Sequence, residues 1–200
     1  GVSSAASDVY KRQLYRQELK ADDARLILEA GLNYDTTMCI WSDNRLYGNK
    51  LNDRIQEYSQ ATKVTPFLMP SIDQLLARGI TKILWYDDIS KIQQIEKKLR
   101  ETALFHNVTF CTSKPFYLEF FSSKVSKATA IDRIGEIYGF TQAETIAIGD
   151  GFNDLSMIRH AALGAAMGNA PDGVKECADY ITTRTNNQDG VAEVLEKFIL

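Results

Sequence analysis

The stretch TIAIGDGFND, residues 145–154, joins a short apolar run to a turn that contains two aspartates and an asparagine. Residues 145–148 predict a strand with both faces covered, as is usual in a parallel sheet. Glycines at 149 and 151 let the chain bend tightly, and a helix is expected from Asn153 to His160. Because ligands of open α/β sheets bind beyond the carboxyl ends of the strands, the polar side chains of this turn are expected to line a binding crevice.

Asp150, Asn153 and Asp154 offer the hard oxygen atoms that Mg²⁺ prefers. The same residue types also form turns that begin helices without any ligand. Upstream, Ser126 is expected to cap a helix that has Lys127 in its first turn. The free N–H groups at such a helix start favour an anion, and the lysine adds a charge that could hold a phosphate. Most lysines in this position are only solvated, so both interpretations stay open.

Residues 122–200 alternate strands and helices with short connections. The helix after Ser126 ends at Gly139, a short helix follows Pro171, and a last helix closes the chain. This alternation predicts an open parallel α/β sheet. Further strands are expected at 163–167 and 180–182, and the helix before Gly139 carries an apolar stripe formed by Ile131, Ile134, Ile137 and Tyr138.

Residues 14–121 mix helices with hairpins, which predicts an α+β layer separate from the parallel sheet. Residues 36–41 and 45–47 flank a Ser42-Asp43-Asn44 turn and indicate a hairpin. Asp22 is expected to cap a short helix that stops at Gly31. Further helices are expected at 51–63, at 71–78 with Ser71 as the N-cap, and at 89–104, and further strands at 81–86, 107–112 and 116–121.

The first thirteen residues, GVSSAASDVYKRQ, show neither helical nor strand periodicity. They resemble a leader that recurs in front of unrelated truncated sequences. Residues 1–13 are therefore interpreted as an artefactual or disordered leader and set aside from the fold.

The composition is that of an ordinary globular protein, with 44% hydrophobic and 24% charged residues in 200. A net charge of −3 without a basic stripe argues against a nucleic-acid partner. No apolar run is long enough to span a membrane, and no secretion signal is recognisable. Cys39, Cys111 and Cys177 are scattered, so we expect buried free thiols and a reducing cytoplasm.

Several short motifs follow one another in a fixed order. They are YLE at 117–119, Ser126-Lys127, GDGFND at 149–154, AMGNA at 166–170 and DGV at 189–191. Together they resemble the signature of Cof-type phosphatases of the haloacid dehalogenase (HAD) superfamily, which carry a type IIB cap. The resemblance extends over nearly all residues after Gln13, more loosely in the first half, where TKI at 81–83 matches best. It implies an α+β cap domain at 14–121 and the C-terminal part of an open parallel, Rossmann-like HAD hydrolase core at 122–200.

The resemblance also implies a function. The complete enzyme would be a Mg²⁺-dependent phosphatase that hydrolyses a small phosphorylated metabolite, a sugar phosphate, through an aspartyl-phosphate. Asp150 would be a Mg²⁺ ligand, Lys127 would neutralise the phosphoryl oxygens, and Asp154 would orient Lys127. Asn153 would contact the phosphate or substrate. Asn169 would support the same crevice or only form a turn.

Other residues in the matched region are interpreted as structural. Glu119 and the Asp189-Gly190 turn belong to this group. Trp41, Tyr47 and Trp85 are expected in the core rather than at the substrate.

The chain departs from the family pattern in one respect. The family's nucleophile and its acid/base partner lie in an Asp-x-Asp motif that precedes the cap, and only residues 1–13 precede the cap here. Asp22-Asp23 has the wrong spacing and context. The nucleophile is therefore expected in a missing N-terminal part, and these residues alone are expected to be inactive. A non-catalytic phosphate-binding module, a phosphomutase and a nucleotide-cofactor phosphatase are the alternatives.

Overall fold

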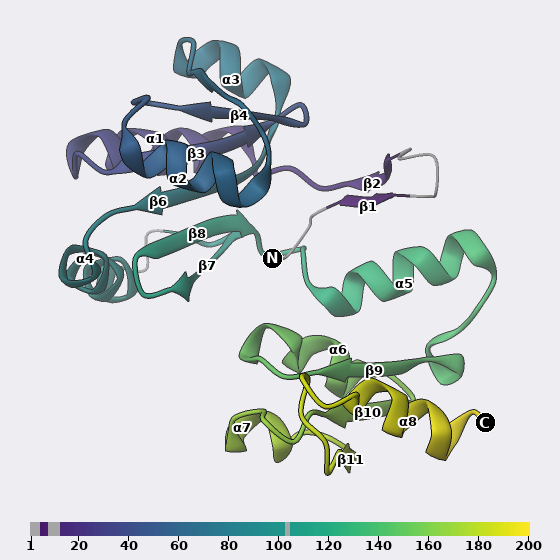
Figure 1. Cartoon of the computed structure of the whole chain (residues 1–200). Helices are drawn as coiled ribbons and strands as arrows, with labels where there is room; N and C mark the ends of the chain where they lie inside the picture. The colour runs from purple at the N-terminus through teal and green to yellow at the C-terminus, as the bar shows by residue number, and fades with distance from the viewer. Residues whose placement is uncertain (1–4, 8–12, 103–104) are drawn as a thin grey trace. The chain divides into compact units, whose positions relative to one another are not determined.

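A computed structural model describes residues 5–7, 13–102 and 105–200. The chain divides into two compact units, the first ending at Lys124 and the second running from Val125 to Leu200 (Figure 1). The expected boundary lay at residues 121 and 122. The predicted leader falls mostly outside the described residues, although strand β1 (Ala5–Ser7) pairs with β2 (Gln13–Arg16).

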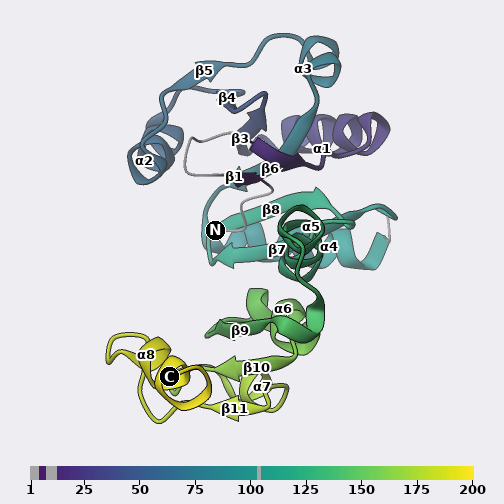
Figure 2. The same cartoon turned by 90° about the vertical axis from the view of Figure 1, so that its right-hand side faces the viewer.

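The first unit is built on a six-stranded sheet with the order β5-β4-β3-β6-β8-β7 (Figure 2). Neighbouring strands are antiparallel except β4 and β5, which are parallel. The strands are β3 (Thr37–Ser42), β4 (Arg45–Gly48), β5 (Pro66–Leu68), β6 (Ile80–Tyr86), β7 (Val108–Lys114) and β8 (Tyr117–Ser122). The sequence did not predict β5, a three-residue edge strand that begins with a proline.

The predicted hairpin is confirmed as β3–β4. Its turn consists of Asp43 and Asn44, with φ of 48° and 56°. Two left-handed residues match the twist of the flanking strands in a two-residue hairpin, and Asp and Asn tolerate that conformation. Ser42, expected in the turn, is instead the last residue of β3.

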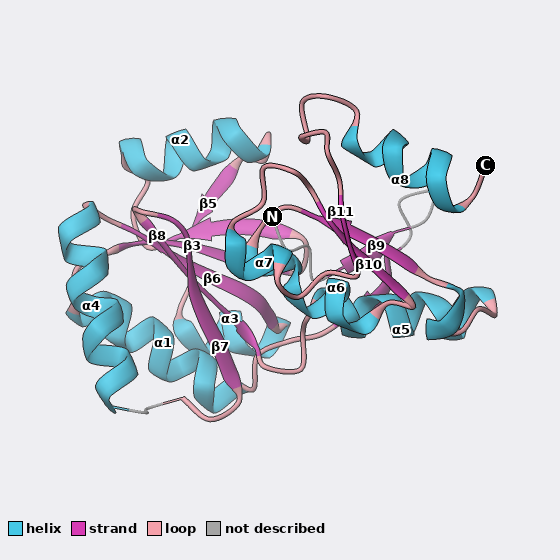
Figure 3. Cartoon of the chain, turned by 90° about the horizontal axis from the view of Figure 1, so that it is seen from below, coloured by secondary structure: helices cyan, strands magenta, loops and turns pink. Residues whose placement is uncertain are grey.

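Four helices cover the two faces of this sheet. Helices α1, α3 and α4 bury apolar residues on one face, around Trp85 and Phe120, whose ring centroids lie 4.5 Å apart. Helix α2 covers part of the other face, as Figure 3 shows. The helices are α1 (Ala21–Asn33), α2 (Asp53–Thr62), α3 (Ile72–Arg78) and α4 (Ile89–Thr102).

The predicted limits of α1 are wrong. The helix begins after Lys20 rather than at an Asp22 cap, and it continues through Gly31 to Asn33. A Cβ atom at Gly31 would overlap the Met38 sulfur and lie 2.8 Å from Trp85 Nε1. The glycine therefore permits close packing of the helix on the sheet and does not end the helix. Ser71, in contrast, caps α3 as predicted.

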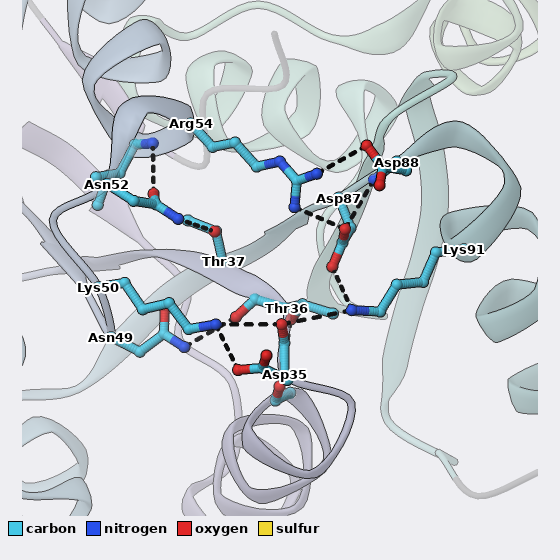
Figure 4. Close-up of polar contacts among 12 residues, drawn as sticks. Asp35, Thr36, Thr37, Asn49, Lys50, Asn52, Arg54, Asp87, Asp88 and Lys91 are labelled. Atoms are coloured by element: carbon cyan, nitrogen blue, oxygen red, sulfur yellow. Dashed lines mark hydrogen bonds and ion pairs between the residues drawn. The ribbon is translucent and has the colours of Figure 1, made fainter.

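A dense polar network lies where β6 ends (Figure 4). Asp87, only 3% exposed, forms ion pairs with Arg54 of α2 and Lys91 of α4, both at 2.6 Å. A second nitrogen of Arg54 lies 2.8 Å from Asp88 Oδ1. Burial raises the pKa of the Asp87 carboxyl, but hydrogen bonds from Lys91 and the Asp88 N–H, with the Arg54 charge, outweigh it and hold this pKa below its ordinary value. The network ties α2 and α4 to β6.

We expect Asp87→Asn to lower the free energy of unfolding by about 2–3 kcal/mol, less than for a fully buried pair because Arg54 and Lys91 can still reach water. Asp88→Asn, which alters an exposed partner of the same arginine, should cost less than about 1 kcal/mol. Urea denaturation at pH 7 checks both values. Because the Asp87 pKa is lower in the folded state, the loss should shrink as pH falls through that pKa. Equal stability of the two variants would contradict this role.

The second unit contains a three-stranded parallel sheet with the order β11-β10-β9. The predicted alternation of strand and helix is confirmed. The strands are β9 (Ile146–Gly149), β10 (Leu163–Ala166) and β11 (Tyr180–Ile181), and the helices are α5 (Lys127–Tyr138), α6 (Leu155–His160), α7 (Asp172–Lys175) and α8 (Gly190–Phe198), with short 3₁₀ turns at Gln142–Glu144 and Phe152–Asp154.

One burial expectation for this unit is wrong. Strand β9 is not fully covered on both faces, because Ile146 and Ile148 are only half-buried. Among the described residues it is also an edge strand that pairs with β10 alone. The predicted apolar stripe of α5 is half-buried at Ile131 and Ile134 and exposed at Ile137 (48%) and Tyr138 (63%). Helix α5 packs mainly against α6 rather than against the sheet. In the part of the chain that is described, no helix is long and apolar enough to cross a membrane.

The three cysteines are free thiols, as predicted, but only Cys39 is buried. Burial raises the pKa of the Cys39 thiol to about 12. Cys111 and Cys177 are half-exposed. Cys111 lies on β7, an edge strand of the larger sheet, where fewer neighbours cover it.

Candidate active site

Three loops follow the carboxyl ends of the three parallel strands of the second unit. Asp150 comes directly after β9, Asn169 lies in the loop after β10, and Asn186 lies in the loop after β11. Lys127 is the first residue of α5, which Ser126 caps as predicted. The carboxyl ends of parallel strands share one edge of a sheet, and this edge is where ligands of such sheets bind.

Asp154 is fully engaged within the protein. Its Oδ1 atom accepts a hydrogen bond from Lys127 Nζ, and its Oδ2 atom accepts from the N–H groups of Asp150 and Gly151, each at 3.0 Å. A Cβ atom at position 149 would overlap this carboxylate, which explains the glycine there. Burial raises the pKa of Asp154, but the hydrogen bonds from Lys127 and the two N–H groups outweigh it, so the pKa lies below its ordinary value.

The contact between Lys127 and Asp154 agrees with the role expected for Asp154, which was to orient Lys127, while Asp150 was the expected metal ligand. Asp154 is 5% exposed and its charge is already matched by Lys127. It fixes the lysine at the start of α5 and the backbone of the turn. Of the two aspartates in this turn, Asp150 is therefore the one whose carboxylate could coordinate a metal ion.

Asp150 is held differently, by neutral donors. Its Oδ2 atom accepts from Asn186 Nδ2 at 2.9 Å and from Asn169 Nδ2 at 3.2 Å. Amide groups are neutral donors, so these hydrogen bonds bring no positive charge to the carboxylate. Asn169, for which a turn-forming role was an alternative, thus contacts the predicted metal ligand directly.

These residues partly fit a Mg²⁺ ion. Asp150 is a half-buried carboxylate, and carboxylate oxygens are hard ligands of the kind the ion takes. Within the described ranges, no group of three or more His, Cys, Asp or Glu side chains could hold a metal. Asp150 would therefore contribute one ligand, and water, substrate oxygens and other residues of the complete protein would contribute the rest.

The predicted site residues are brought together unequally. A continuous path of hydrogen bonds joins Lys127, Asp154, Asp150 and Asn169. Asn153 stands apart from this path. It is exposed, and in the described part of the chain its side chain has no hydrogen-bond partner. Its role stays a prediction, as do the roles of the other four.

Sequence reasoning missed Asn186. This residue precedes the DGV motif by three positions, in a loop whose composition indicates only a turn. The pattern that would have pointed to it is its place after the third parallel strand, where loops of neighbouring strands meet. The DGV motif itself starts α8, with Asp189 in the left-handed region at φ 58°.

The residues interpreted as structural lie in ordinary packing environments. Glu119 on β8 forms an ion pair with Lys82 on β6 at 3.2 Å. Trp85 and Tyr47 are buried in the core. Trp41 is half-buried and donates a hydrogen bond to the Tyr58 hydroxyl.

Comparison with known proteins identifies the family. The family described as haloacid dehalogenase-like hydrolase matches residues 4–195. This chain belongs to that family. A crystal structure of such a hydrolase from Bacteroides thetaiotaomicron superposes with a TM-score of 0.78 at 30% identity, covering 94% of this chain and 70% of that one. The predicted family and α/β fold class are thereby confirmed.

Two HAD relatives carry phosphatase names. A Haemophilus influenzae protein, provisionally named a phosphatase, is 32% identical over 167 residues, which are 84% of this chain and 60% of that protein. A Bacillus subtilis protein named 5-amino-6-(5-phospho-D-ribitylamino)uracil phosphatase is 47% identical over 88 residues, 44% of this chain and 35% of that protein. The chain thus spans about three fifths of the first relative.

Proposed function

We propose that the complete protein is a Mg²⁺-dependent phosphatase that hydrolyses a small phosphorylated metabolite through an aspartyl-phosphate. The observation that carries this proposal is the hydrogen-bonded path from Lys127 to Asp150 at the carboxyl ends of parallel strands. It links a lysine held by Asp154 to the turn that carries Asp150, through the Asp150 N–H group. The phosphatase names of the relatives support the same reaction class.

In this proposal each residue has a defined task. Lys127, oriented by Asp154, binds the phosphoryl oxygens and offsets the charge that builds up during transfer. Asp150 holds Mg²⁺, which when bound supplies further positive charge at the phosphoryl group. Asn153, at the open side of the turn, is free to contact substrate. The proposed nucleophile is the aspartate of an Asp-x-Asp motif, which these 200 residues do not contain. Its carboxylate oxygen forms a bond to phosphorus as the ester oxygen leaves, and water then hydrolyses the acyl phosphate.

The substrate we favour is a sugar phosphate. A second candidate comes from the relative named for 5-amino-6-(5-phospho-D-ribitylamino)uracil, which shares 47% identity over 88 residues. Both compounds present a phosphate monoester on a polyhydroxylated carbon chain, so the Lys127–Asp150 arrangement serves either one. The free thiols of the three cysteines agree with a reducing compartment such as the cytoplasm.

A substrate panel on the complete protein tests the proposal. Released phosphate would be measured with hexose and pentose phosphates, with 5-amino-6-(5-phospho-D-ribitylamino)uracil and with nucleotides, all in Mg²⁺. We expect kcat/KM to be at least about tenfold higher for a sugar phosphate than for a nucleotide, a difference that one or two specific contacts can supply. Preference for the ribitylamino compound would support the second candidate. Isomerisation without phosphate release would indicate a phosphomutase, and binding without either would indicate a non-catalytic module.

A further inference from the structure

Asn186 closes a ring of hydrogen bonds with Asp150 and Asn169. Its Nδ2 donates to Asp150 Oδ2 at 2.9 Å, and its backbone N–H donates to Asn169 Oδ1 at 2.8 Å. Asn169 Nδ2 reaches the same Asp150 oxygen at 3.2 Å. The ring therefore joins the loops that follow all three parallel strands.

We propose that Asn186 is a positioning residue that fixes the Asp150 carboxylate for metal binding. This inference rests on the proposed function, in which Asp150 is the metal ligand. Two amide donors engage the same oxygen, so rotation of the carboxylate is restrained. In the described residues Asp150 Oδ1 accepts no hydrogen bond, and that oxygen is left for a cation.

The chemistry of the donors explains why asparagines suit this position. A lysine or arginine would also restrain the carboxylate, but its charge would compete with the metal, as Lys127 does at Asp154. The orientation of both amides is settled by their partners. A backbone N–H can only donate and a carboxylate can only accept, so Asn169 must present its oxygen to Asn186 and its NH₂ group to Asp150.

The loop that carries Asn186 is itself firmly held. The Glu193 carboxylate of α8 accepts hydrogen bonds from the N–H groups of Thr183 and Arg184, at 2.8 and 3.0 Å. These and a bond from the Tyr180 hydroxyl lower the pKa of Glu193 to about 2. The Arg184 carbonyl in turn accepts from the Gly168 N–H at 3.1 Å. The Asn186 amide is thus presented from a fixed backbone, as partners that orient metal ligands usually are.

The test compares Asn186→Ala with Asn187→Ala in the complete protein. Loss of a partner that orients a metal ligand typically weakens metal binding by about 10–100-fold. We expect Asn186→Ala to raise the Mg²⁺ concentration for half-maximal phosphate release by about tenfold, with KM for the ester unchanged. Asn187 is exposed and, within the described residues, its side chain has no partner, so its variant should match the wild type.

Binding of Mn²⁺, measured by electron paramagnetic resonance, gives a readout that does not depend on turnover. Unchanged Mn²⁺ affinity in Asn186→Ala would overturn the positioning role. An inactive wild type whose Mn²⁺ binding is still weakened by the substitution would refute the proposed function and leave the positioning role intact. If Asn186→Ala fails to fold, Asn186→Ser keeps a polar side chain that is too short to reach Asp150 and should show the same weakened binding.

Discussion

These 200 residues, purified alone, are expected to release no phosphate from a phosphate ester in the presence of Mg²⁺. The same residues joined to an N-terminal part with an Asp-x-Asp motif should hydrolyse the ester. In the proposed mechanism Lys127 binds an anion and Asp150 a cation, but neither accepts the phosphoryl group. The expected difference is therefore a loss to the uncatalysed rate rather than a partial defect. Phosphate release from a generic ester, assayed on both proteins at equal concentration, measures it.

The folding of the short form needs its own control, since an unfolded protein would also be inactive. Strand β9 pairs on one side only in the described part of the chain, and α5 exposes Ile137 and Tyr138. An unpaired strand edge beside apolar surface favours aggregation. We expect the short form to elute partly as aggregates in size-exclusion chromatography. Comparable turnover by soluble monomers of both forms would show that the nucleophile lies within these residues.

Asp150→Asn in the complete protein should lower kcat by about a thousandfold, which corresponds to about 4 kcal/mol of lost transition-state stabilisation. The amide has nearly the same shape but no charge, so it can no longer attract a divalent cation. Both asparagines donate to Oδ2, so the new amide would place its oxygen there and its NH₂ group at the position of Oδ1, the oxygen that is left for a cation. Steady-state kinetics at several Mg²⁺ concentrations check the value.

Asp172→Asn supplies the matched control for that experiment. Asp172 is an exposed aspartate of α7 in the same unit, and its substitution removes one carboxylate charge, as Asp150→Asn does. Its kcat should stay within about twofold of the wild type, because solvent and salt screen the charge of an exposed side chain. Unimpaired turnover by Asp150→Asn would remove Asp150 from the metal site.

Local signals in the sequence predicted much of this fold. Ser71 and Ser126 cap helices because their hydroxyl groups accept hydrogen bonds from free N–H groups in the first helical turn. Such a cap depends only on a few neighbouring residues, so it can be predicted from the local sequence. The Asp43-Asn44 turn is equally local. The role of Gly31 was not predictable. A glycine that lets a helix pack closely against a sheet and a glycine that ends a helix look alike in sequence.

The candidate site shows the same division. Lys127, Asp150 and Asp154 were found through recognisable motifs. The bond between Asn186 and Asp150 joins residues 36 positions apart and depends on where the third strand's loop returns to the sheet. Neither a hydrophobic period nor a helix cap in the sequence predicts the path of that loop. Asp154 was expected to orient Lys127, and the structure adds that its second oxygen accepts hydrogen bonds from the N–H groups of Asp150 and Gly151.

The six-stranded sheet of the first unit has consequences for protein engineering. Its two hydrophobic clusters lie on opposite faces of one set of strands, and the chain enters at Leu19, whose N–H binds the Ile80 carbonyl, and leaves at Ser123, whose N–H binds the Asn107 carbonyl. Residues 19–123 thus form a natural block for exchange with the equivalent block of a relative. Such chimaeras would keep Lys127, Asp150 and Asn186 in their own sequence context and would change only the residues of the first unit.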